Sequence, residues 1–349
     1  SKSLNVPPYN EHFRSDLGRE MDPALLTNVA QWAAADWVRL EFQAVSKVLP
    51  LAVNQITQPY LTIDLRHFDT LIESLCAQDV AILGLVDYRS VANQGWKGAL
   101  PNTPDDNQMS ADYQQLLLRT LRLLIERYKE RIRYWEIWNE PDFRPLDGRD
   151  TYLPPADFAN LLFAARQLMQ GANPAAKLVS GGLGGITNDA SAYFREFYQS
   201  VQAFPDSAYD VLALHPYPFK IAGQNWRDPK IYLRYGLSAD ERTRLDRFQK
   251  MVTLARDQGK PIWVTELGWN SAQGEPTCGG YGEDFVTRAE QMAYLVASFD
   301  ILFKESAWRS GNVFLAPGVT NIFWYQYHDT AFGVNCAAQR GTAPAFRSP

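Results

Sequence analysis

DYQQLLLRTLRLLIERYKERI, residues 112–132, leads almost directly into YWEIWNEPD, residues 134–142, and this pair of segments decides the fold. In the first segment, apolar residues recur at the three- and four-residue spacing of an amphipathic helix. The second is a short aromatic-rich run that stops at Pro141, which is typical of a strand. A helix followed at once by a buried strand is the repeating unit of an α/β protein with a parallel sheet.

The same alternation extends in both directions along the chain. The other expected strands are LNV (4–6), WVRLEF (37–42), VAILGLVDY (80–88), KLVSGGLGG (177–185), YDVLALHPYP (209–218), PIWVTELGWN (261–270) and TNIFWYQYHD (320–329). The other expected helices cover residues 22–36, 64–79, 155–174, 192–202, 238–259 and 287–305. Eight strands separated by helices predict a (β/α)8 barrel.

The chain offers no material for a second domain. We find no internal repeat, low-complexity tract or Pro/Ser-rich linker, so we expect residues 1–349 to form one barrel. The last segment, residues 330–349, is too short and too rich in Pro for a full eighth helix, which we expect to be brief or absent.

Composition and charge restrict the partners. The chain is 46% hydrophobic and 21% charged, with a formal net charge of −5 and no dense run of Lys or Arg. We therefore expect no nucleic-acid partner. No run of about 18 apolar residues is present, so we expect no membrane partner either. Aromatic residues make up 13% of the chain, which suits stacking on sugar rings as well as an ordinary core.

Two glutamates lie where expected strands end, which is where such barrels carry their catalytic groups. Glu140 ends the fourth strand and Glu266 the seventh. Hydrolysis of a glycosidic bond needs two carboxyl groups facing one another. Either glutamate alone would more often be a solvated charge, but their joint placement favours catalysis. Strict alternation predicts that each shares a face with the residues two and four positions before it, Trp138 and Glu136 in one strand, Val264 and Ile262 in the other.

WNEP (138–141) and TELGW (265–269) resemble the two signatures of clan A glycoside hydrolases, and the resemblance extends from Leu4 to about Asp329. In overall look the chain is nearest to family 39 and family 5. The resemblance implies that Glu140 is the acid/base, that Glu266 is the nucleophile, and that hydrolysis proceeds with retention through a covalent glycosyl-enzyme. We expect a monomer that needs no cofactor.

Two further residues gain roles from this resemblance. Asn139 is similar to the residue that binds the sugar 2-hydroxyl, and Arg39 to the second-strand arginine beside the nucleophile. A cation at that place would favour the ionised form of Glu266. A structural ion pair of Arg39 with Glu41 or Glu136 is an alternative that does not exclude this role.

On the sixth strand, His215 and Tyr217 resemble the His-x-Tyr pair of the clan. On the eighth strand, Trp324 resembles the tryptophan that forms the floor of the cleavage subsite. Core packing is the alternative for His215 and Trp324. On the third strand several families place a histidine where this chain has Asp87 and Tyr88, so Asp87 is a candidate substrate ligand that departs from the pattern.

Aromatic residues in the expected loops indicate the substrate. Trp96, Trp226 and Trp269 suggest binding platforms away from the cleavage point, which favours an endo-acting β-glycanase. Each ring could instead pack against its own loop. An exo-acting β-glycosidase or a transglycosylase would use the same pair of glutamates.

Other classes fit less well. The four histidines form no metal-binding spacing, which argues against a metal-dependent hydrolase. A glycine-rich phosphate site would follow strand seven or eight, whereas GGLGG follows strand five. A non-catalytic carbohydrate-binding barrel is the main alternative from another class, and the presence of both glutamates argues against it.

Three cysteines are too few for a disulfide scaffold. Cys278 and Cys336 each follow an expected strand in neighbouring loops, so either a disulfide or two isolated thiols is consistent with the sequence. A disulfide would indicate an oxidising compartment. The chain shows no signal peptide, and we expect a secreted or periplasmic protein from the nature of the substrate.

Overall fold

The computed structural model describes residues 2–6, 35–42, 46–48, 61–63, 65–92, 111–142, 151–184, 190–216, 260–269, 286–300, 302 and 319–324. Within these residues, eight strands form one sheet in the order β8-β7-β5-β2-β1-β11-β10-β9, with parallel pairing throughout. They are β1 (Lys2–Val6), β2 (Trp37–Glu41), β5 (Ala81–Val86), β7 (Tyr134–Asn139), β8 (Lys177–Gly182), β9 (Leu212–Leu214), β10 (Ile262–Leu267) and β11 (Val319–Trp324). The strands fall within or overlap the eight expected segments, so an α/β fold with parallel strands is confirmed.

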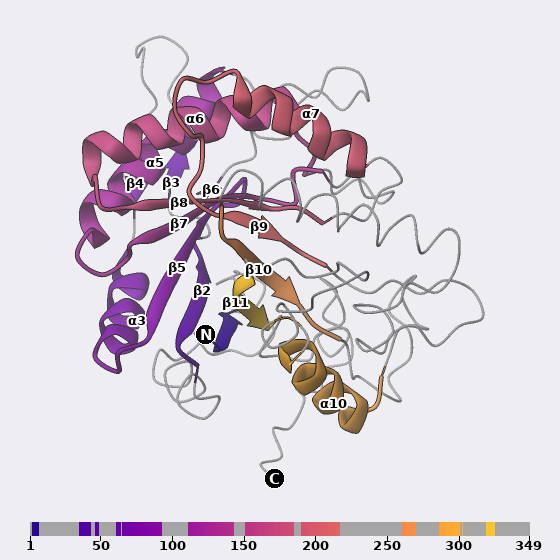
Figure 1. Ribbon diagram of the computed structural model, residues 1–349. Helices are drawn as coiled ribbons and strands as arrows, with labels where there is room; N and C mark the ends of the chain where they lie inside the picture. The colour runs from indigo at the N-terminus through magenta and orange to yellow at the C-terminus, as the bar shows by residue number, and fades with distance from the viewer. Residues whose placement is uncertain are drawn as a thin grey trace, which may run out of the picture.

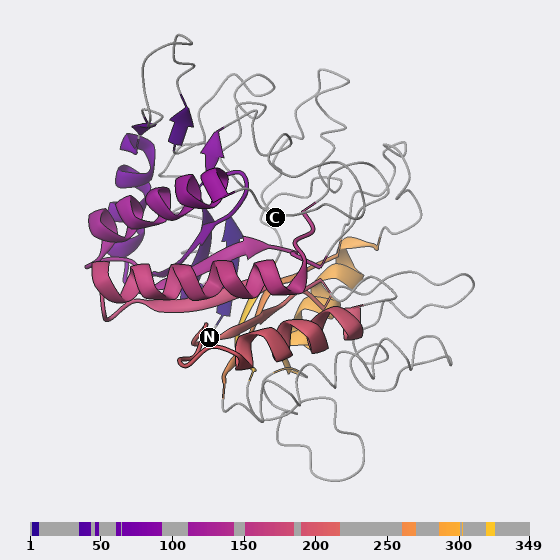
Figure 2. The same cartoon turned by 90° about the horizontal axis from the view of Figure 1, so that it is seen from above.

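The described helices lie around these strands (Figure 1). They are α3 (Arg66–Cys76), α5 (Ala111–Tyr128), α6 (Pro155–Ala172), α7 (Ala190–Gln202) and α10 (Arg288–Phe299). On one side, α6 packs between α5 and α7 and against β8, as the view from above also shows (Figure 2). None of the helices in the described ranges is both long enough and apolar enough to cross a membrane.

Some helix predictions need correction or lie outside the described residues. The helix expected at 22–36 does not include Ala35 and Asp36, which are not helical, and the rest of it is not described. The segments 238–259 and 330–349 also lie outside the described residues. In the last expected helix (287–305), α10 covers Arg288–Phe299 and begins at a capping box in which Thr287 and Glu290 bond each other reciprocally. Asp300 and Leu302 are π-helical, and residues 301 and 303–305 lie outside the described residues.

A second, smaller sheet was not predicted. It contains β3 (Ser46–Val48), β4 (Leu61–Ile63) and β6 (Val91–Ala92), in the order β4-β3-β6. Strands of two or three residues are too short to show a period, which is why the sequence pattern missed them. Because they follow β2 and β5 in the chain, they extend the structure beyond the carboxyl ends of those two strands.

The main sheet is strongly curved, because rings from strands that are not neighbours pack on its inner face. The ring centroid of Trp263 on β10 lies 5.2 Å from that of Trp37 on β2 and 4.8 Å from that of Tyr134 on β7. Four strands separate β7 from β10 in the sheet order. The inner cluster also contains Leu83, Val179, Val211, Ala213 and Phe323.

The two outermost strands of this order also touch. Isolated parallel bridges join Val179 to Val211 and Leu183 to Leu214, which connects β8 with β9. Closure of the whole sheet into a (β/α)8 barrel stays a prediction. Residues of the opposite parity, such as Val38, Ile82, Trp135 and Val264, belong to the large outer core that the helices cover.

Candidate active site

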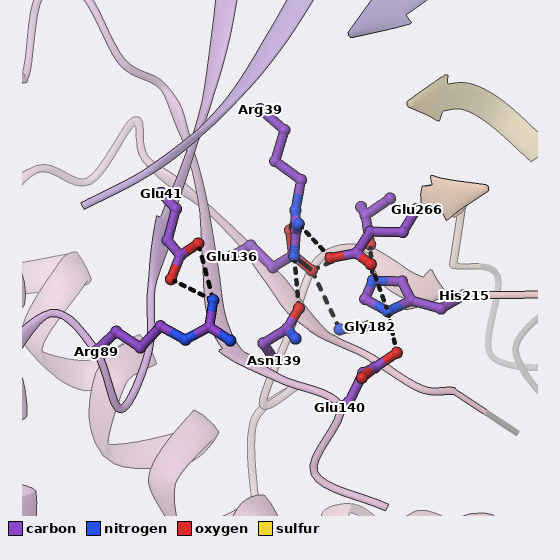
Figure 3. A network of polar contacts seen from close by, with 10 residues as sticks. Arg39, Glu41, Arg89, Glu136, Asn139, Glu140, Gly182, His215 and Glu266 are labelled. Carbon is purple, nitrogen blue, oxygen red and sulfur yellow. Dashed lines mark hydrogen bonds and ion pairs between the residues drawn. The ribbon is translucent and has the colours of Figure 1, made fainter. Parts of the chain in front are cut away.

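The guanidinium of Arg39, in the middle of β2, connects three side chains of β7 and β10 (Figure 3). Its Nε donates to Glu136 at 2.6 Å, its Nη1 to Glu266 at 2.7 Å and its Nη2 to Asn139 Oδ1 at 2.9 Å. Burial alone would lower the pKa of Arg39, but Glu136 and Glu266 raise it well above its ordinary value. Arg39 is therefore a fixed cation that favours the ionised form of Glu266. The two geometries considered for it, beside Glu266 and paired with Glu136, are both present.

Glu136 is the fully buried centre of this network. Besides the two nitrogens of Arg39, its carboxylate accepts hydrogen bonds from Thr265 Oγ1 at 3.0 Å and from the backbone N of Gly182 at 3.1 Å. A buried carboxylate needs such a full set of donors to offset the loss of water. Glu136 thus ties β2, β8 and β10 to its own strand.

His215, which directly follows β9, lies between the two catalytic candidates. Its Nδ1 is 3.1 Å from Oε1 of Glu140 and 3.7 Å from Oε2 of Glu266, and its Nε2 is 3.0 Å from Oγ1 of Thr265. The ring is fully buried. Burial alone would lower the pKa of His215, but the carboxylates of Glu266 and Glu140 raise it above its ordinary value. The structure thus brings the three predicted residues together.

The backbone around Glu140 departs from regular strand geometry. Trp138 has φ 74° and Glu140 has φ 47°, in a region that side chains other than glycine seldom adopt. Trp138 Nε1 donates to the carbonyl of Thr151 at 2.8 Å, and Thr151 Oγ1 donates to the carbonyl of Glu140 at 2.8 Å. The predicted common face of Glu136 and Trp138 is wrong, because Trp138 belongs to the outer core whereas Glu136 faces inward.

The alternation predicted for β10 is also wrong. Ile262 and Val264 belong to the outer core, whereas Trp263 packs in the inner cluster. A register irregularity follows Val264 in the pairing with β11. Both Thr265 and Glu266 therefore contact the polar network. Such irregularities re-aim side chains near active sites, and strict alternation cannot anticipate them.

Asp87 directly follows β5 and is fully buried. Its Oδ1 accepts from the backbone N of Arg89 at 2.8 Å, while its Oδ2 is buried and has no hydrogen-bond partner among the residues that the structure describes. Burial and the nearby Glu41 raise the pKa of Asp87 to about 8. Arg89 in turn lies 3.3 Å from Glu41 (Figure 3). The role of Asp87 as a substrate ligand stays a prediction.

The predicted aromatic platforms are described only in part. Trp324 is partly buried and stacks on Trp269 with ring centroids 5.6 Å apart. Trp269 is only 7% exposed and also contacts Tyr294 of α10, so its ring contributes mainly to packing. The other predicted residues lie outside the described residues: Tyr217, Trp96, Trp226, Cys278 and Cys336.

Ligand atoms of Glu140, His215 and Glu266 lie within 4.8 Å of one another, a spacing that a cation could also use. The positively charged guanidinium of Arg39 already forms an ion pair with the Glu266 carboxylate. A second cation at this point would be repelled by the guanidinium. We therefore interpret these side chains as an acid–base site and do not assign them as metal ligands.

Sequence reasoning missed the roles of Thr265, Gly182 and Thr151. Thr265 lies inside the TELGW motif, but strict alternation placed it on the face opposite to Glu266, which is why it was missed. Gly182 belongs to a glycine-rich run, which often marks a close approach of backbone to a side chain. Thr151 had no signal, since nothing in its local sequence points to the backbone of Glu140.

The carboxyl groups of buried Glu266 and partly buried Glu140 lie close to His215 at the ends of parallel strands, an arrangement suited to acid–base chemistry. Residues 105–300, more than half of the chain, match the family model described as the glycosyl hydrolase catalytic core. The chain therefore belongs to this family and is a glycoside hydrolase.

Solved structures agree on the fold. A family 39 glycoside hydrolase from Bacteroides cellulosilyticus superposes with a TM-score of 0.57 at 17% identity, over 93% of this chain and 56% of that one. A monomeric β-xylosidase from Caulobacter crescentus superposes with a TM-score of 0.58 at 16% identity, over 94% of this chain and 60% of that one. The endoglucanase Cel5A from Thermotoga maritima superposes with a TM-score of 0.56 at 13% identity, over 94% of this chain and 90% of that one.

These structural neighbours are TIM-barrel glycosidases, and they confirm the expected resemblance to families 39 and 5. The chain spans only 56% and 60% of the first two neighbours. A comparison with curated protein sequences found no match.

Proposed function

We propose that this enzyme cleaves β-glycosidic bonds with retention, by double displacement at Glu140 and Glu266. The carrying observation is that an oxygen of Glu140 and an oxygen of Glu266 lie within 4.8 Å of each other. Retaining enzymes hold their carboxyl groups about 5 to 5.5 Å apart, whereas inverting enzymes need about 6.5 to 9.5 Å to admit a water molecule.

In the first step Glu140 protonates the leaving oxygen while Glu266 attacks the anomeric carbon. Arg39, bonded to Glu266 at 2.7 Å, keeps the attacking group ionised. In the second step Glu140, now a carboxylate, takes a proton from the water that displaces Glu266. Both steps pass through a transition state with positive charge on the sugar ring, which the negative charge of the buried Glu266 carboxylate favours.

Asn139 is proposed to bind the sugar 2-hydroxyl. Its Oδ1 accepts from Arg39, which fixes the orientation of the amide. The NH₂ group is therefore the part left to donate to a ligand. Such a bond strengthens as the transition state forms.

The finer assignments are also proposals. We propose an endo-acting enzyme on a β-linked polysaccharide, in which residues 1–349 form a single monomeric barrel. Contacts between β8 and β9, such as Ser180 N to Val211 O at 2.9 Å, support closure. Coverage of 90% of the endoglucanase supports a one-domain plan. A polymeric substrate is found outside cells, which supports a secreted or periplasmic location.

Azide rescue tests the assignment of the two glutamates. Wild type, Glu140→Ala and Glu266→Ala are assayed on 2,4-dinitrophenyl β-glycosides of glucose, xylose, galactose and mannose, with and without azide. Azide should rescue both variants, giving an α-glycosyl azide from Glu266→Ala and a β-glycosyl azide from Glu140→Ala. Glu126→Ala, which changes an exposed glutamate on α5, is the control that should keep full activity.

Two results would overturn the proposal. If both alanine variants turn over substrate as fast as wild type, the site is wrong. If wild type binds the sugars but releases no dinitrophenol, the alternative of a non-catalytic carbohydrate-binding protein is favoured.

A further inference from the structure

Four side chains, two from strands β7 and β10 and two that directly follow β9 and β7, form a continuous line of hydrogen bonds, Glu136 to Thr265 to His215 to Glu140 (Figure 3 labels three of them). Hydrogen positions along such a line follow from counting donors and acceptors. The count can start at Glu136, because the donors around this carboxylate leave it only the role of acceptor.

Glu136 can only accept hydrogen bonds in this arrangement. Its two oxygens receive bonds from Arg39 Nε and Nη2, from Gly182 N and from Thr265. A proton on either oxygen would face one of these donors. The 3.0 Å contact between Thr265 Oγ1 and Glu136 Oε1 therefore contains the hydroxyl proton of Thr265.

Thr265 has only that one hydroxyl proton. Towards His215, whose Nε2 lies 3.0 Å from the same oxygen, Thr265 must therefore act as an acceptor. The hydrogen in that contact belongs to Nε2 of the ring. The neutral form of His215 is thereby fixed as the tautomer protonated on Nε2, which leaves a lone pair on Nδ1.

The lone pair of Nδ1 faces Glu140 Oε1 at 3.1 Å. Such a contact needs one proton between the two atoms. Either Glu140 is protonated and donates to Nδ1, or the ring is an imidazolium that donates to the Glu140 carboxylate. In both cases the Glu140 and His215 pair holds one proton.

We propose that Thr265 is a positioning residue that fixes the His215 tautomer, so that Glu140 and His215 share and store the single proton used in catalysis. The catalytic part of this inference rests on the proposed function, whereas the tautomer does not. During glycosyl transfer to Glu266 the stored proton goes to the leaving oxygen as the bond from C1 to that oxygen breaks. During hydrolysis the attacking water returns one proton to the pair as its oxygen bonds to C1 and the bond from C1 to the Glu266 oxygen breaks.

The surrounding charges suit a stored proton. In the described part of the chain, the charged groups that act on His215 are Glu140 at the end of β7, Glu266 on β10 and Arg39 on β2. Glu136 on β7 acts through Thr265. The two carboxylates next to the ring outweigh both burial and Arg39, so the pKa of His215 is raised and an imidazolium is within reach.

Nitrogen-15 NMR of histidine-labelled, full-length protein tests the tautomer directly. The chain has only four histidines, and His215→Asn identifies the signals of interest. Wild type should show a protonated Nε2 at every pH and a titrating Nδ1. Thr265→Ser, which keeps the hydroxyl, should give the same pattern. Thr265→Val should give an unprotonated Nε2 in the neutral ring.

A wild-type spectrum with a bare Nε2 would overturn the proposal without any variant, and so would an unchanged Nε2 signal in folded Thr265→Val. Circular dichroism establishes folding, and the wild-type spectrum decides the tautomer if the valine variant does not fold. These spectra need no turnover, so their failure is distinguishable from failure of the azide test.

A kinetic measurement tests the catalytic part. Thr265→Val should lower kcat/KM about tenfold or more on aryl β-glycosides with poor leaving groups, out of the roughly 10²- to 10⁴-fold that acid catalysis contributes. On 2,4-dinitrophenyl glycosides, which need no proton, the loss should be below about threefold. An equal loss on both substrates would show that Thr265 acts only on structure.

Discussion

A Cβ atom built on Gly182 would lie 1.9 Å from Nε2 of His215. The ring thus fills the space that any larger residue at position 182 would need, and the ring cannot move aside easily because it is fully buried. Gly182 on β8 is therefore a condition for His215 to reach Glu140 and Thr265.

Gly182→Ala should both destabilise the fold and displace His215. Overpacking of this kind costs about 1 to 3 kcal/mol, measurable by urea denaturation, and activity should fall strongly. Gly171→Ala is the matched control. It lies near the end of α6 with open space around its Cα, so it should stabilise the protein by about 0.5 to 1 kcal/mol. Equal stability of the two variants would contradict the packing argument.

Glu136→Gln should cost about 3 to 5 kcal/mol of unfolding free energy, because it leaves the buried charge of Arg39 without its main partner. An amide also places a donor against groups that themselves donate. The same change at Glu126, which is exposed and 4.0 Å from Arg122, should cost less than about 0.5 kcal/mol. If Glu136→Gln left the free energy of unfolding nearly unchanged, solvent would have to reach the network.

Thr151→Val should impair catalysis more than stability. It removes the hydrogen bond to the carbonyl of Glu140, whose backbone has φ 47° and is held in place by its surroundings. The loss of stability should be about 1 to 2 kcal/mol, whereas kcat should fall and the alkaline limb of the pH profile, on which Glu140 loses the proton that it donates, should shift. Thr70→Val, the same change on an exposed turn of α3, should alter neither activity nor the pH profile. A loss of stability with an unchanged pH profile would reduce Thr151 to a structural role.

Asp87→Asn should change how stability depends on pH. The pKa of Asp87 is raised from 3.8 to about 8 in the folded protein by burial and by Glu41. Its protonated form therefore favours folding fully below pH 3.8, and this contribution is lost as the pH rises through about 8. The asparagine variant lacks this loss, so its stability relative to wild type should increase with pH, by at most about 1.4 kcal/mol per pH unit.

Urea denaturation at intervals between pH 5 and 9 measures this trend. Asp69→Asn is the control of opposite sign. The side-chain bond from Arg127 lowers the pKa of Asp69, so the contribution of Asp69 is present above pH 3.8 and is lost only as the pH falls through its lowered value. The deficit of Asp69→Asn should therefore stay constant from pH 5 to 9. A constant difference for Asp87→Asn as well would show that Asp87 is ionised throughout.

The approximate positions of the eight main strands along the chain were predicted from hydrophobic periodicity and from turn-forming residues in the sequence. Most of these strands contain a run of apolar residues between helix-like segments of the sequence, so the local pattern was sufficient to locate them. Strands of two or three residues carry no such pattern, and β3, β4 and β6 were missed for that reason. The faces of Trp138 and Val264 were predicted wrongly because positive φ at Trp138 and a register irregularity after Val264 interrupt the alternation.

By itself, the sequence determined which segments are strands and which glutamates end them, because hydrophobic period and motif spacing are properties of nearby residues. Only the tertiary structure decided which groups these glutamates meet. His215 and Thr265 are 50 positions apart, and Glu136 and Thr265 are 129 apart, yet each pair is joined by a hydrogen bond of 3.0 Å. The curvature of the sheet, seen in the contacts of Trp263 with Trp37 and Tyr134, brings such residues together, and no local pattern encodes which distant strands face each other.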